Sequence, residues 1–99
     1  MAKRKIIWTE KANIERKEIL EYWISRNQSK VYSIKLNRLF VETARRVATH
    51  PTIGRPTSIA SVRVTIVRSY LMFYEYHSTH IKILTVWDGR RHQSQLSLK

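Results

Sequence analysis

The sequence contains no cysteine and very little glycine or proline. Its 99 residues include two Gly and two Pro. Without cysteine the chain cannot form a disulfide, a thiolate metal site or a thiolate nucleophile. The apolar run that follows the basic N-terminus ends at Trp8 and is too short for a signal peptide or a membrane span. We therefore expect a soluble protein of the reducing cytoplasm.

Acidic residues are also scarce, and the chain is strongly basic. Lys and Arg number 19 against seven Asp and Glu, which gives a formal net charge of +12. A chain of this charge attracts polyanions through its long-range field and through counterion release. The excess is spread over both halves of the sequence, which favours a basic folded surface over a disordered tail. Three classes of partner fit this charge: RNA or DNA, an anionic membrane surface, and an acidic protein.

Composition and length indicate one small folded domain, residues 1–99. Hydrophobic residues make up 42% of the chain and aromatic residues 10%, well above the range of disordered sequences. A domain of this size has a thin core and room for one site or interface. The predicted elements are, in order, a strand at 5–8, helices at 10–26 and 30–49, a loop at 51–58, and strands at 62–67, 70–76 and 81–87.

The order β-α-α-β-β-β predicts an α+β fold. Two adjacent helices joined by a short polar link predict an antiparallel helical hairpin, and Thr9 is a suitable N-cap for the first helix. The three later strands are joined by short turns and predict a mainly antiparallel sheet. We expect the helical hairpin to cover one face of this sheet, so the other face must be solvated or used in binding.

The last predicted strand ends in the sequence Asp88-Gly89-Arg90-Arg91. Asp-Gly between two apolar runs signals a hairpin, because both residues tolerate the positive φ of a type I′ turn. Here no second apolar run follows, so we expect the pair to end the strand and to direct Arg90 and Arg91 toward an anionic partner. Guanidinium groups suit this role because they bind phosphate or carboxylate in a fork geometry.

Other polar side chains of the predicted sheet have structural interpretations. The tyrosines that alternate along 70–76 are expected to pack in the core with a polar tip. His77 and His80 bracket a turn and lack a neighbouring carboxylate ligand, so we expect solvated histidines rather than a metal site. Glu75 is expected to pair with a cation.

Five short motifs occur in a specific order and spacing along the chain. They are W-x-x-x-A at 8–12, ILEYW at 19–23, HPTIGRP at 50–56, VRVTIVRSYLMFYEY at 62–76 and IKILTVWDGRR at 81–91. Together with the predicted element order, they resemble the RelE/ParE superfamily of type II toxins over nearly the whole chain. The resemblance implies a small basic toxin with a RelE-like fold. It also implies a partly disordered acidic antitoxin that is usually encoded beside the toxin, and a pair that represses its own promoter.

The superfamily contains two activities, and the sequence resembles one branch more than the other. RelE-like members cleave mRNA in the ribosomal A site, whereas ParE-like members poison DNA gyrase. RelE-like nucleases carry basic residues where this chain has Thr65 and Leu71, and they carry a tyrosine in the C-terminal tail, which this chain lacks. The Y-L-M-F-Y stretch at 70–74 and the strand-end DGRR resemble the ParE branch. The resemblance therefore favours a non-catalytic inhibitor of DNA gyrase.

Two alternatives remain open: a ribosome-dependent, metal-independent endoribonuclease that acts on mRNA, and an inactive or purely binding member of the superfamily. If the chain is a nuclease, the candidate catalytic residues are Arg63, Glu75, Arg90, Arg91 and His92. The candidates for binding the target or a phosphate are Arg63, Arg68, Tyr70, Arg90 and Arg91. We expect an acidic antitoxin and either gyrase or the ribosome with its mRNA as partners. We expect no membrane partner, no metal and no small-molecule cofactor.

Overall fold

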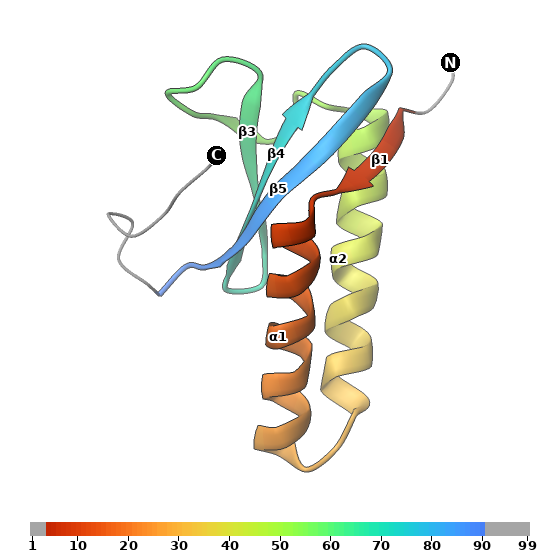
Figure 1. The fold of residues 1–99 in the computed structure, drawn as a ribbon, viewed down its shortest axis with the longest axis vertical. Coiled ribbons are helices and arrows are strands. Elements are labelled where there is room, and N and C mark those ends of the chain that lie inside the picture. The colour runs from red at the N-terminus through yellow and green to blue at the C-terminus, as the bar shows by residue number, and fades with distance from the viewer. Residues whose placement is uncertain (1–3, 91–99) are drawn as a thin grey trace.

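The computed structural model describes residues 4–90 of the chain and confirms the predicted α+β class (Figure 1). Its elements are β1 (Lys5–Trp8), α1 (Glu10–Asn27), α2 (Val31–Thr49), β2 (Arg55–Pro56), β3 (Val62–Val67), β4 (Tyr70–Tyr76) and β5 (His80–Asp88). The predicted helices and strands agree with these bounds to within one residue. The short β2 is a correction, because residues 51–58 were predicted as loop throughout.

The strands form a single mixed sheet with the order β1-β5-β4-β3-β2. β1 runs parallel to β5, and all other neighbouring pairs are antiparallel. A parallel pair requires a long crossover connection, and here the helical hairpin and β2 to β4 lie between β1 and β5 in the sequence. The prediction of a mainly antiparallel sheet is confirmed.

The two helices lie side by side as an antiparallel hairpin against one face of the sheet (Figure 1). Thr9 caps α1, since its Oγ1 accepts the N–H of Ala12 at 3.1 Å. The helix ends at Gln28, which has a φ of 52° and a backbone N–H that donates to the carbonyl of Ile24. This left-handed residue is a common way to end a helix, and it turns the chain toward α2. Neither helix is long and apolar enough to cross a membrane.

The main core lies between the helices and the sheet. Leu36, Phe40 and Val47 of α2 are fully buried against Met72 and Tyr74 of β4. Burial of each of these large side chains stabilises the fold by roughly 1.5–3 kcal/mol. The predicted packing of the tyrosines is confirmed, since Tyr70 and Tyr74 belong to this core and Tyr76 packs against it.

The opposite face of the sheet carries a second, smaller apolar cluster. It is formed by Val62, Phe73 and Trp87, of which Phe73 and Trp87 are each 7% exposed. Ile59 packs against it from the compact segment before β3, where the Thr57 hydroxyl donates to two backbone carbonyls. This face is therefore apolar at its centre rather than simply solvated.

Candidate functional site

The end of the sheet at which β5 stops brings together three of the predicted binding residues. Tyr70 pairs with Asp88 across β4 and β5, and it also pairs with Val67 across the β3–β4 hairpin. Arg68 lies in that two-residue hairpin and has a φ of 58°. Arg90 follows two residues after Asp88, so Arg68, Tyr70 and Arg90 share this end of the sheet.

Gly89 joins the end of β5 to the β3–β4 hairpin. Its N–H donates to the carbonyl of Ser69 at 2.8 Å. A Cβ atom on Gly89 would lie 2.7 Å from that carbonyl oxygen. Neither glycine of the chain has a positive φ. The strand ends at Asp88 as predicted, but the glycine is required for close backbone approach and not for a left-handed turn.

The Asp88 carboxylate binds both the backbone N–H and the side chain of Arg90. The Oδ1 atom of Asp88 accepts the Arg90 backbone N–H at 3.0 Å and the Nε–H at 3.1 Å, while Oδ2 accepts from Nη2 at 2.9 Å. These contacts raise the pKa of the Arg90 guanidinium above its ordinary value. The Arg90 side chain nevertheless remains 64% exposed, compared with 21% for Asp88. The cation is therefore both held in place and accessible.

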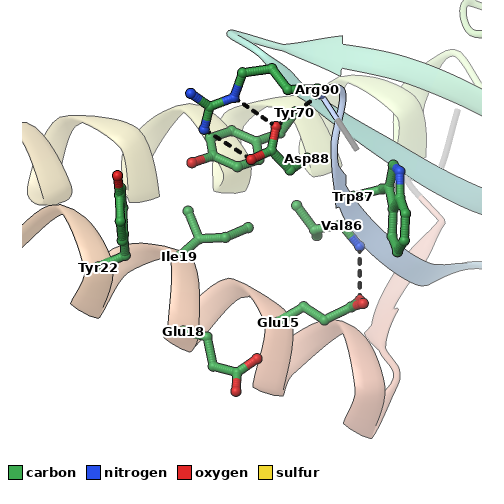
Figure 2. Close-up of a pocket in the computed structure, with 9 residues that line it drawn as sticks. All are labelled: Glu15, Glu18, Ile19, Tyr22, Tyr70, Val86, Trp87, Asp88 and Arg90. Carbon is green, nitrogen blue, oxygen red and sulfur yellow. Dashed lines mark hydrogen bonds and ion pairs between the residues drawn. The ribbon is translucent and has the colours of Figure 1, made fainter. Parts of the chain in front are cut away.

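A pocket of about 280 Å³ lies beside this pair, between α1 and β5 (Figure 2). Its lining residues are Glu15, Glu18, Ile19, Tyr22, Tyr70, Val86, Trp87, Asp88 and Arg90. Figure 2 shows Ile19 and Val86 facing each other across the pocket, with Arg90 and Asp88 at its rim. Tyr22 is 48% exposed on the α1 side. The site thus combines an apolar floor with a charged rim.

The pocket exists because α1 replaces β1 along the outer edge of β5. β1 pairs with β5 only as far as Ile83. Beyond that point the Thr9 hydroxyl donates to the carbonyl of Leu84 at 3.1 Å. The Glu15 carboxylate then accepts the Val86 N–H at 3.1 Å and the Thr85 hydroxyl at 2.7 Å. Side chains of the N-terminal segment therefore satisfy backbone groups that a neighbouring strand would otherwise bind.

Tyr70 supports the site from within the core. Its side chain lies in the main core, its residue is 3% exposed, and its hydroxyl accepts the Trp23 Nε1–H at 2.8 Å. Burial is the main cause of a raised pKa for this phenol. Although sequence reasoning placed Tyr70 among the target-binding candidates, the structure gives it the position of a support beneath Arg90 and Asp88.

Arg63 lies away from this site and binds the chain itself. Its Nη1 donates to the carbonyls of Thr52 at 3.2 Å and Gly54 at 2.8 Å. The Tyr74 hydroxyl anchors the same segment by donating to the carbonyl of Pro51 at 2.7 Å and accepting the Gly54 N–H at 3.0 Å. The guanidinium of Arg63 is therefore occupied in fixing the segment between α2 and β2.

Glu75 lies near the far end of β4, beside the turn to β5. It hydrogen-bonds His77 at 3.1 Å, and the His77 ring stacks on His80 with centroids 4.5 Å apart. Glu75 and Tyr70 are five positions apart on one strand, which is about 16 Å at roughly 3.3 Å per residue.

The candidate nuclease residues are not brought together in the structure. Arg63 is bound to the segment between α2 and β2, Glu75 lies at one end of β4, and Arg90 lies at the other end of the sheet. Arg91 and His92 lie outside the described residues. Within residues 4–90, no three His, Asp or Glu side chains group as metal ligands.

Comparison with known proteins identifies the family. The sequence model described as the ParE toxin of the type II toxin-antitoxin system parDE matches residues 6–93. The chain belongs to the ParE toxin family. The predicted membership of the RelE/ParE superfamily is thereby confirmed, and the chain is a toxin of a type II toxin-antitoxin module. A search of curated proteins finds no match.

The ParE fold is also shared with a solved structure, that of the chromosomal ParDE TA system from P. aeruginosa. The similarity has a TM-score of 0.73 at 18% sequence identity, and it covers 86% of this chain and 95% of that one. At this level of identity the likeness shows a common fold.

Two features of this ParE-family site were not identified from the sequence. One is the bond between Asp88 and Arg90, although the spacing Asp-x-Arg carries a signal, since Asp side chains commonly bind a backbone N–H two residues later. The other is Glu15, which contacts a residue 71 positions away. No local pattern marks Glu15, because its role depends on how α1 leaves the sheet.

Proposed function

We propose that this ParE-family toxin inhibits DNA gyrase by binding it, without catalysing a reaction, and that it acts in the cytoplasm. The observation that carries the proposal is the exposed, ordered Arg90 at one end of the sheet. Arg68 is exposed at the same end, in the adjoining hairpin. Two accessible guanidinium groups beside an apolar pocket suit the recognition of an anionic protein surface.

The separation of the nuclease candidates supports a non-catalytic mode of action. General acid and base groups must lie within hydrogen-bond reach of one reacting centre. Arg63 is bound to the carbonyls of Thr52 and Gly54, and Glu75 lies on the other side of the sheet from it, opposite Val62. Arg90 lies at the Tyr70 end of the sheet, and Tyr70 is five positions from Glu75 along β4, or about 16 Å at roughly 3.3 Å per residue.

We further propose that an acidic antitoxin neutralises this toxin. The similar structure comes from a ParDE toxin-antitoxin system. The net charge of +12 favours an acidic partner, because opposite charges steer the two proteins together and increase the rate of association.

A parallel assay of both candidate targets tests the proposal. Purified toxin is added to a gyrase supercoiling reaction and, separately, to translating ribosomes whose mRNA is analysed by primer extension. We expect inhibition of supercoiling and no cleavage. Arg90→Ala is expected to weaken inhibition by at least about tenfold, as for loss of a charge-assisted contact. Arg45→Ala, an exposed arginine on α2, serves as the matched control. Cleavage of mRNA at A-site codons with gyrase unaffected would overturn the proposal.

A further inference from the structure

The carboxylate of Asp88 occupies only one edge of the Arg90 guanidinium. This group carries five N–H donors, on Nε, Nη1 and Nη2. Asp88 takes the Nε–H and one donor of Nη2. The outer edge, formed by Nη1 and the remaining hydrogen of Nη2, makes no hydrogen bond to any residue in the range 4–90. This free edge has the geometry that binds a second carboxylate through two parallel hydrogen bonds.

The base of this arrangement is fixed by the sheet. Asp88 is the last residue of β5 and pairs with Tyr70, whose hydroxyl is bound by Trp23 of α1. The next residue, Gly89, is tied to Ser69 by a backbone hydrogen bond of 2.8 Å. The Arg90 backbone N–H also binds Asp88, so the same carboxylate holds both the main chain and the side chain of Arg90.

We propose that Asp88 is a positioning residue that orders Arg90 before binding and presents its outer edge to a carboxylate of the protein target. The inference rests on the proposed function, in which Arg90 contacts the target. It adds that a negatively charged residue of this basic toxin promotes its binding to an acidic surface.

Ordering and net charge make opposite predictions for removal of Asp88. Loss of a negative charge strengthens long-range attraction to an anionic partner. Loss of the two side-chain hydrogen bonds frees the long Arg90 side chain, which must then be immobilised on binding. Immobilising one such side chain weakens affinity by about three- to tenfold. The sign of the effect therefore separates positioning from simple electrostatics.

A double-mutant cycle tests the proposal, using wild type, Asp88→Ala, Arg90→Ala and the double variant of the full chain. Inhibition of gyrase supercoiling and growth arrest after expression are measured for each. We expect Asp88→Ala to weaken both about three- to tenfold, and to change them by less than about twofold when Arg90 is already alanine. An equal loss in both backgrounds, no loss, or a gain would overturn the inference.

Two further variants separate positioning from stability. Asp88→Asn retains one oxygen acceptor for Arg90 and is expected to give an intermediate loss. Glu42→Ala removes an exposed carboxylate from α2 and should leave inhibition unchanged. Thermal unfolding of each variant shows whether the fold is intact. If Asp88→Ala does not fold, Asp88→Asn tests the inference in its place. Full activity of a folded Asp88→Asn variant would then contradict the inference.

The cycle also distinguishes this inference from the proposed function. Full activity of Arg90→Ala would remove Arg90 from the target contact and overturn both. A strong loss in Arg90→Ala beside a fully active Asp88→Ala would overturn the positioning role alone. If gyrase is unaffected by wild type while growth arrest follows the expected cycle, the proposed target is wrong and the role of Asp88 stands.

Discussion

Replacement of Glu15 by alanine removes the group that closes the outer edge of β5. The Glu15 carboxylate accepts the N–H of Val86, which is 3% exposed, and the hydroxyl of Thr85, which is fully buried. Leaving a buried donor without a partner costs about 1–3 kcal/mol. The Thr85 hydroxyl can rotate toward another acceptor, whereas the backbone N–H cannot. We therefore expect a loss of about 2–4 kcal/mol in the free energy of unfolding, with Val86 as the larger contribution.

Thermal and urea unfolding of three variants measure this loss. For a domain of this size each kcal/mol lowers the Tm by about 4–8 °C, so Glu15→Ala should lower it by at least about 8 °C. Glu15→Gln keeps an amide oxygen as acceptor and should lose about half as much. Glu18→Ala, an exposed neighbour on the same helix, should change stability by less than about 0.5 kcal/mol. A loss in Glu15→Ala as small as that in Glu18→Ala would refute the reasoning, because water entering from the pocket would then replace the carboxylate.

Two further substitutions test the anchors at the two ends of the sheet. Tyr74→Phe removes the hydroxyl that binds Pro51 and Gly54, and should lower the free energy of unfolding by about 1–3 kcal/mol in urea titrations. An unchanged stability would mean that these backbone groups find other partners. Gly89→Ala places a Cβ atom 2.7 Å from the Ser69 oxygen and should displace Arg90, so inhibition of the target falls about tenfold while stability falls by less than about 2 kcal/mol. Full inhibition by a folded Gly89→Ala would show that the position of Arg90 does not depend on this contact.

The elements that the sequence predicts well are those with strong periodic patterns. In α2 apolar residues recur at helical spacing, and the three long strands are rich in β-branched and aromatic residues. The weakly amphipathic α1 is marked instead at its start by the Thr9 N-cap. The two-residue β2 has no pattern of its own, and its proline is tolerated because β2 is an edge strand. The parallel pairing of β1 with β5 joins residues about 75 positions apart, as between Lys5 and His80. Such pairings depend on the packing of the whole domain and leave no local signal.

The candidate site was predicted less completely than the fold. Arg63 and Arg90 look alike in the sequence, since each is a basic residue in or beside a strand. Their difference comes from their surroundings: Arg63 faces two free carbonyls of a turning segment, whereas Arg90 meets one carboxylate and solvent. Charge alone does not separate an arginine that fixes the fold from one that is available to a partner.

Net charge and ordered charge act on different steps of binding in this basic toxin. Three of its seven acidic residues line the pocket beside Arg90, so the local charge there is lower than the total of +12 suggests. Long-range attraction depends on the total charge, sets the rate of encounter and is screened by salt. A short contact made by an ordered guanidinium mainly determines how slowly the complex dissociates. A carboxylate such as Asp88 can therefore reduce the local field and still strengthen the complex, because it lowers the entropy that Arg90 loses on binding.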